Sequence, residues 1–129
     1  MIYALLILTA FNVINAFADA VRILGNKPIA HWLNFGLYAL IFLGSCSAMD
    51  LVWYKALLLA VWAYCNRQIF FDILLNLRRG LKWDYVSLDK PPKALTDRIE
   101  VKLWGYNGRI GVAVYSTLLI IITILIFVL

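Results

Sequence analysis

The sequence predicts an all-α polytopic integral membrane protein, with four transmembrane helices and a short amphipathic helix at the inner leaflet. Composition is the first reason: 64% of the 129 residues are hydrophobic and only 15% are charged, whereas soluble domains average about 45–50% apolar and about 25% charged residues. The second reason is that the apolar residues gather into four runs, each near the roughly 20 residues with which a helix crosses a bilayer. Residues 1–129 are therefore expected to form a single four-span membrane domain, arranged as a four-helix bundle.

Residues that end helices separate the four runs. Gly25 and Pro28 divide the first run from the second, because glycine suits the position after a helix and proline starts the next helix well. Asp50 lies in a tight connection between the second run and the third. The predicted spans cover residues 1–20, 29–49, 51–77 and 110–129.

Basic residues predict the orientation of these spans. The polar segment 78–109 holds eight of the twelve Lys and Arg residues. The positive-inside rule then places this segment and the 22–27 loop in the cytoplasm, with both termini outside. We expect an inner-membrane protein encoded by a bacterium or a phage. Its partners are expected to be the lipid bilayer and the anionic headgroups of the inner face, and not nucleic acid. The residues expected to contact headgroups are Arg78, Arg79 and Lys82.

Part of this polar segment has the pattern of an amphipathic helix. Leu95, Ile99 and Leu103 recur at i, i+4 and i+8, and the charged residues, among them Asp97 and Glu100, lie mostly off that stripe. This spacing predicts a short helix that lies on the inner leaflet. The alternative is a cytoplasmic loop packed under the spans.

Polar residues recur every three or four positions in the first three runs, which places them on one face of each helix. At 1.5 Å per residue, most of them fall about 21–31 Å from the outer end, in the inner half of a hydrocarbon core about 30 Å thick. We therefore predict that they converge into one polar cluster. The members of this cluster are Asn15, Asp19, His31, Asn34, Arg67, Gln68, Asp72 and Asn76.

Charged members of this cluster need partners, because an ion in the hydrocarbon costs at least about 2.5–3.5 kcal/mol. On an α-helix Arg67 points about 140° away from Asp72. We therefore expect Asp19, which lies at a similar depth, to pair with Arg67. Asp72 is then expected to meet His31 or Arg79.

Three interpretations of the cluster remain open. In the first, the polar residues only hold the helices together, as hydrogen bonds between transmembrane helices do. In the second, a homo-oligomer uses them for ion or proton passage, because His31 titrates near neutral pH. This is a channel-like or holin-like function: small phage lysis proteins (holins) share this size, span count and basic segment. We prefer the second interpretation, although no motif assigns the chain to a family.

The third interpretation is a small membrane enzyme, or a protein that binds a lipid headgroup or a metal. Asp19, His31 and Asp72 offer one imidazole and two carboxylates, a set that suits a divalent metal ion. Alternatively, Asp72 could orient His31 as a general base, while Arg67 and Arg79 hold a phosphate. The sequence contains no Ser-His-Asp or Cys-His arrangement, and no catalytic residue is assigned.

Overall fold

A computed structural model describes residues 1–25, 31–86 and 95–129, and it describes the side chains of these residues except 31–33, 95 and 96. Every regular element in these ranges is a helix. The elements are α1 (Ile2–Leu24), α2 (His31–Ala48), α3 (Trp53–Asn66), the π-helix η1 (Arg67–Asp72), α4 (Ile73–Arg78), α5 (Leu95–Trp104) and α6 (Gly108–Val128).

Three helices are long and apolar enough to cross a membrane, as expected for an integral membrane protein. They are Ile2–Leu24, Trp53–Arg78 and Gly108–Val128. The second of them runs without a break through α3, η1 and α4. The fourth predicted span falls on α2, whose described apolar part is shorter, Asn34–Ala48.

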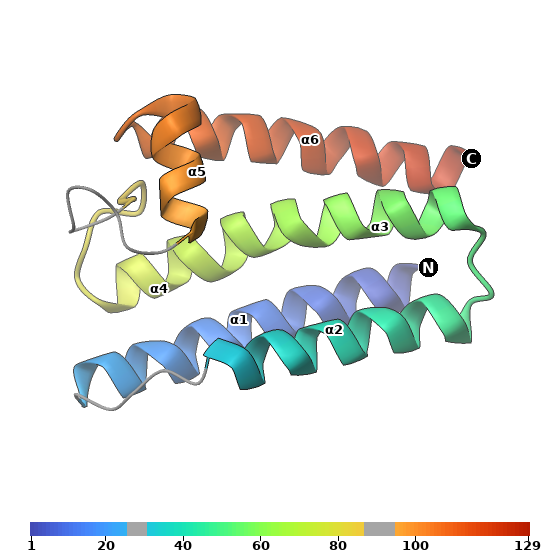
Figure 1. The fold of residues 1–129 in the computed structure, drawn as a ribbon, viewed down its shortest axis with the longest axis horizontal. Helices are drawn as coiled ribbons and strands as arrows, with labels where there is room; N and C mark the ends of the chain where they lie inside the picture. Colours follow the sequence, from blue (N-terminus) through green and yellow to red (C-terminus); the bar gives the residue numbers. More distant parts are fainter. Residues whose placement is uncertain (26–30, 87–94) are drawn as a thin grey trace.

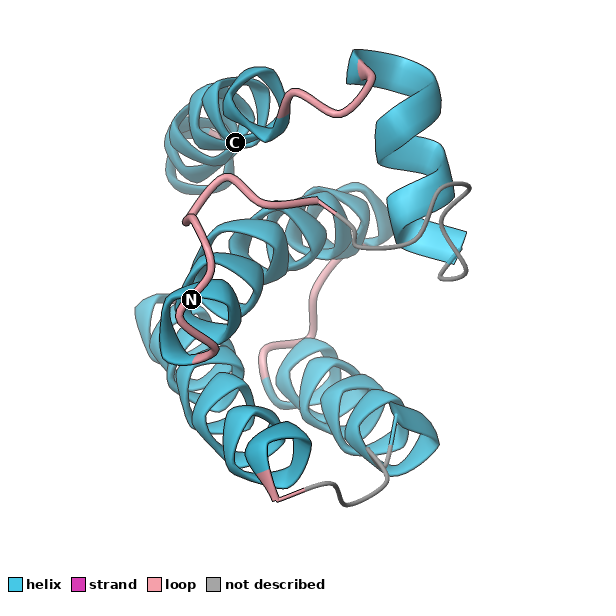
Figure 2. Cartoon of the chain, turned by 90° about the vertical axis from the view of Figure 1, so that its left-hand side faces the viewer, coloured by secondary structure: helices cyan, strands magenta, loops and turns pink. Residues whose placement is uncertain are grey.

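The long helices run along a common axis (Figure 1). Both termini and the connection between α2 and α3 lie at one end, and α5 crosses at the other (Figure 1). We expected a four-helix bundle. The observed arrangement is an open arc, in which α2 packs on α1, α1 on η1 and α4, and α3 on α6. Figure 2 shows this arc, with α2 and α6 at opposite ends.

The apolar core lies towards the end that carries the termini. Leu8 of α1 and Leu59 of α3 are fully buried there and pack with Trp62 and Ile122. The Trp62 indole nitrogen donates a hydrogen bond of 2.9 Å to the Thr123 hydroxyl, which joins α3 to α6. Large apolar side chains also cover the outer faces of the long helices. Such an apolar surface suits contact with lipid.

Residues with left-handed backbone conformation follow three of the helices, at Asp50, Gly80 and Gly105. α4 closes in a Schellman motif, in which the Leu81 N–H bonds to the Asn76 carbonyl at 2.9 Å and Gly80 has a φ of 71°. α2 closes in the same way, with Asp50 (φ 45°) in place of the glycine, and aspartate is one of the few other residues that adopt this conformation. The turn at Gly80 sends the chain back across α4, which brings residues 81–86 to the candidate functional site.

Candidate functional site

The long helix Trp53–Arg78 changes its period at Arg67–Asp72, which forms a π-helix. Residues five apart on an α-helix point about 140° from each other. In a π-helix the hydrogen bonds join residues i and i+5, so Arg67 and Asp72 turn towards one face. Both of them line one cavity. Single π-helical turns occur frequently at functional sites.

Arg67 and Asp19 contact different groups in the structure. The Arg67 guanidinium lies over the Phe71 ring, 4.4 Å from the ring centroid, in a cation–π contact. Asp19 accepts two hydrogen bonds of 3.1 Å from Asn34 and lies 3.8 Å from Arg22. The predicted pair of Asp19 and Arg67 is therefore wrong, because it assumed a regular α-helix that directs Arg67 away from Asp72.

The return segment, residues 81–86, is held across α4 and the start of α6. The Asn76 amide nitrogen donates to the Tyr85 carbonyl at 2.8 Å and to the Trp83 carbonyl at 3.5 Å. Arg109 of α6 donates to the Asp84 carboxylate at 2.9 Å. These contacts bring the return segment to one wall of the cavity, which Trp83, Asp84 and Tyr85 line.

α5 turns its polar face towards the cavity. The Gln68 amide nitrogen donates hydrogen bonds of 3.0 Å to the Glu100 carboxylate and to the Tyr64 hydroxyl. The apolar residues Ile99 and Leu103 are 43% and 59% exposed. An amphipathic helix packed on a protein in water buries its apolar face against that protein. The reverse orientation suits a helix whose apolar face meets lipid.

Aromatic rings close the cavity on the side of α6. Tyr115 is buried, and its ring meets the Tyr64 and Trp104 rings edge to face, with centroids 5.8 and 5.9 Å away. Gly111 allows Trp104 to approach, because a Cβ at this glycine would lie 3.2 Å from the indole nitrogen. The rings thus anchor α5 to α6.

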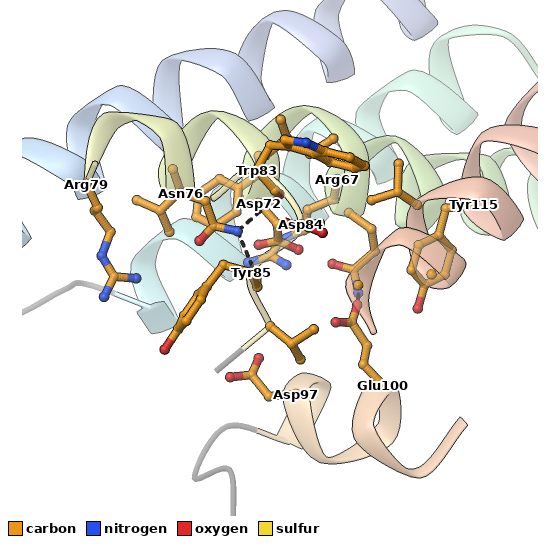
Figure 3. Close-up of a pocket in the computed structure, with 18 of the residues that line it drawn as sticks. Arg67, Asp72, Asn76, Arg79, Trp83, Asp84, Tyr85, Asp97, Glu100 and Tyr115 are labelled. Carbon is orange, nitrogen blue, oxygen red and sulfur yellow. Dashed lines mark hydrogen bonds between the residues drawn. The ribbon is translucent and has the colours of Figure 1, made fainter. Parts of the chain in front are cut away.

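The cavity that these elements enclose has a volume of about 230 Å³. Figure 3 shows Arg79 on one side of it and Tyr115 with Glu100 on the other, with Asp72 between them. Among the described residues, six charged side chains line it. They are Arg67, Asp72, Arg79, Asp84, Asp97 and Glu100. Asp84 is paired with Arg109.

Glu100 is the carboxyl group that α5 contributes to the hydrogen bond with Gln68. Burial raises the pKa of Glu100 above its ordinary value, and the neighbouring Asp97 raises it further. The Tyr115 hydroxyl and the Arg67 guanidinium lower this pKa in part. A positive charge that enters the cavity will favour the ionised form of Glu100.

A separate hydrogen-bond network lies inside the spans. The Asn12 amide donates to the Asn66 amide oxygen at 2.7 Å, and the Asn66 nitrogen donates to the Thr9 hydroxyl at 2.9 Å. The Tyr38 hydroxyl donates to the Ala63 carbonyl at 2.9 Å. Asn12 and Asn66 are 2% and 1% exposed. These groups bond to one another, so this network holds α1, α2 and α3 together.

The predicted polar cluster divides into groups. Asp19 and Asn34 pair between α1 and α2. Asn15 is half-buried and does not line the cavity. The side chain of His31 lies outside the described residues. The members that do line the cavity are Arg67, Gln68, Asp72 and Asn76.

The residues predicted to bind a metal ion or a headgroup do not gather in one place either. In the described part of the chain, no three His, Cys, Asp or Glu side chains come together as metal ligands. A divalent metal on Asp19, His31 and Asp72 stays a prediction, because it depends on His31. Of the predicted headgroup residues, Arg79 lines the cavity and Lys82 is exposed. Arg78 stacks on Phe17, with its guanidinium carbon 4.2 Å from the ring centroid.

Several residues of these sites were not singled out from the sequence. The sequence weakly indicates Glu100 as a site residue, because it lies three positions after Asp97 and off the apolar stripe of α5. Asn66 comes directly before Arg67 and Gln68, and Thr9 lies three positions before Asn12, but spacing within a run does not tell which residues of two different helices meet. Tyr115 gives no sign in the sequence that it reaches the cavity.

No family model, curated protein or solved structure matches this chain. The functional argument therefore depends on the geometry of the cavity.

Proposed function

We propose that the protein is a small integral membrane protein that binds a charged headgroup in the cavity between η1, α4, α5 and α6. The observation that supports this function is the charged lining. Two guanidinium groups, one from η1 and one from the end of α4, and two carboxylates from α5 line the same space. Charged groups at the end of a span are costly unless they meet partners, and a polar headgroup is a partner that a membrane supplies.

The proposed topology places this cavity at the level of the headgroups. α2 serves as a fourth span, so that the termini lie on the outer side and the segment 78–109 on the cytoplasmic side. Support comes from the common end of the two termini (Figure 1) and from the basic residues of the segment. α5 then lies at the inner leaflet with Ile99 and Leu103 in lipid.

A homo-oligomer that passes ions or protons is the second candidate. The open arc supports it, because α2 packs mainly on α1 and has room for a neighbouring copy. However, buried polar groups such as Asn12 and Asn66 bond to each other, which leaves fewer of them to line a path. Ion flux into liposomes that contain the purified protein, with native mass spectrometry of its oligomeric state, tests this candidate. Flux from an oligomer would support it, and a monomer without flux would exclude it.

Lipid binding tests the preferred function. The purified chain in detergent is titrated with dioctanoyl phospholipids and with dioctanoylglycerol, which lacks a headgroup, and binding is followed by native mass spectrometry. Arg79→Gln should weaken phospholipid binding by about tenfold, the effect of losing one hydrogen bond from a charged group. Lys102→Gln removes an exposed charge of α5 and serves as the matched control. Equal binding of dioctanoylglycerol, or an equal loss with Lys102→Gln, would refute the headgroup site.

A further inference from the structure

A hydrogen bond between Gln68 and Glu100 joins α5 to η1. The Gln68 amide nitrogen lies 3.0 Å from the Glu100 Oε1 atom, and Figure 3 shows Glu100 pointing from α5 into the cavity. Gln68 is 3% exposed, and its own Oε1 atom has no hydrogen-bond partner among the described residues. Buried polar atoms are normally hydrogen-bonded, so this pair of side chains needs one more donor.

A proton on Glu100 provides this donor. A protonated carboxyl group has one O–H donor and keeps an acceptor oxygen, which matches the donor and the acceptor of a primary amide. The acid then donates to the Gln68 oxygen while it accepts from the Gln68 nitrogen. If the amide is turned the other way, its oxygen faces Glu100, and an ionised carboxylate has no proton to donate to it. Both orientations of the amide therefore favour a protonated Glu100.

The groups around Glu100 determine how firmly it holds this proton. Burial and the neighbouring Asp97 raise the pKa of Glu100 above its ordinary value of 4.5, whereas the Tyr115 hydroxyl and the Arg67 guanidinium lower it in part. The titratable and charged groups that surround Glu100 in the described part of the chain are Tyr64 of α3, Arg67 and Asp72 of η1, Asp97 of α5 and Tyr115 of α6, with Arg79 and the paired Asp84 further along the cavity.

α5 is anchored at its C-terminal end. Its last residue, Trp104, meets the Tyr115 ring edge to face, and the chain then turns into α6 through Gly105, which has a φ of 65°. Ile99 and Leu103, on the apolar face of α5, are 43% and 59% exposed, so this face adds little packing against the protein. The docking of α5 on η1 therefore depends on its polar face, where Glu100 lies about one turn before the anchor.

We propose that α5 is a pH-dependent lid: protonated Glu100 holds it against η1 through Gln68, and loss of this proton lets α5 turn about Gly105 and opens the cavity. Hinges are commonly a few residues at the ends of helices. As a control of access for a headgroup, this inference rests on the proposed function, whereas the movement itself needs no ligand.

The direction of the pH dependence follows from the two states of Glu100. The docked form has a raised pKa, and the released form, in contact with water, has the ordinary value. Docking is therefore favoured at low pH and weakens as the pH rises from 4.5 through the raised pKa. Each pH unit between these two values corresponds to about a tenfold change in the docking equilibrium.

Spin labels measure this movement in the full chain in detergent. One label is placed on α5 (Ile99→Cys) and one on α6 (Ile120→Cys), both at exposed positions, after the native cysteines are replaced by alanine. Pulsed electron paramagnetic resonance should give one distance at pH 4, and a second distance should appear as the pH rises to 8. A matched pair on two spans, Leu57→Cys with Ile120→Cys, should keep one distance throughout.

Variants identify the titrating group. Glu100→Gln keeps a donor for Gln68 at every pH, so α5 should stay docked from pH 4 to 8. Gln68→Leu removes the amide and should give the released distance already at pH 4. Asp97→Asn should move the transition to lower pH, and Tyr115→Phe should move it to higher pH, because these groups raise and lower the pKa of Glu100. Circular dichroism checks that each variant keeps its helices.

The lid is refuted if the wild type gives the same distances at pH 4 and 8, or if Glu100→Gln still changes with pH. If Glu100→Gln does not fold, a transition that neither Asp97→Asn nor Tyr115→Phe moves refutes it equally. The headgroup site is tested apart from the lid, because Arg79→Gln should weaken phospholipid binding and leave the pH dependence of the distances unchanged. Failure of one proposal is thus distinguishable from failure of the other.

Discussion

The hydrogen bond between Asn12 and Asn66 allows a quantitative test of the packing. Asn66→Leu replaces the amide by an apolar group of similar size. It removes two hydrogen bonds, those of 2.7 Å to Asn12 and 2.9 Å to Thr9. Hydrogen bonds between transmembrane helices contribute about 0.6 kcal/mol on average and about 1.7 kcal/mol at most. Two average bonds correspond to a loss of about 1.2 kcal/mol in the free energy of unfolding.

A double-mutant cycle isolates the shared bond. Asn12→Leu and Asn66→Leu each break it, so the double variant should lose about 0.6 kcal/mol less than the two single variants together. The free energy of unfolding is measured by reversible titration of the protein in mixed micelles with sodium dodecyl sulfate. Thr117→Val is the control, because this exposed hydroxyl donates to the Ala113 carbonyl of its own helix. Its change should stay within about 0.5 kcal/mol.

Additive losses would refute this reasoning. If the double variant equals the sum of the single variants within about 0.3 kcal/mol, the two amides do not interact. A coupling well above about 1.7 kcal/mol would also contradict the estimate and indicate that the variants repack the spans.

Three further predictions follow from the cavity and its surroundings. Asp19→Asn and Arg67→Gln should destabilise the protein additively, because their side chains belong to different groups. Gly108→Ala should destabilise it by about 1–3 kcal/mol, because its Cβ would overlap the backbone of the return segment, whereas Gly44→Ala meets no atom within 4 Å. Because the pKa of Glu100 is raised in the folded protein, this group favours folding at low pH and loses that effect as the pH rises from its ordinary value of 4.5 through the raised pKa.

The first two predictions use the same unfolding titration, and the third uses thermal unfolding in detergent between pH 4 and 8. Rescue of Asp19→Asn by Arg67→Gln would restore the pairing that the structure excludes. Equal effects of Gly108→Ala and Gly44→Ala would contradict the close approach at Gly108. For Glu100, the difference in melting temperature between the wild type and Glu100→Gln should change with pH, and a constant difference would show that burial leaves this carboxyl unperturbed.

The orientation of α5 links its sequence pattern to the cavity. The stripe of Leu95, Ile99 and Leu103 predicted a helix, and a helix is present at Leu95–Trp104. The pattern does not tell whether the apolar stripe faces protein or lipid. The hydrogen bond from Gln68 to Glu100 decides it, because it draws the polar face of α5 towards η1.

The sequence by itself determined the membrane class and the approximate positions of the long helices, because both depend on residues that are close together in the chain. The apolar runs set the long helices, and Asp50 marks the turn that ends one of the apolar runs. Only the tertiary structure decided which polar groups meet. The π-helix at Arg67–Asp72 turns Arg67 towards the face of Asp72, and α2 brings Asn34 to Asp19. The first outcome is a local departure from the regular α-helical period on which the sequence argument relied, and the second depends on packing between two separate helices.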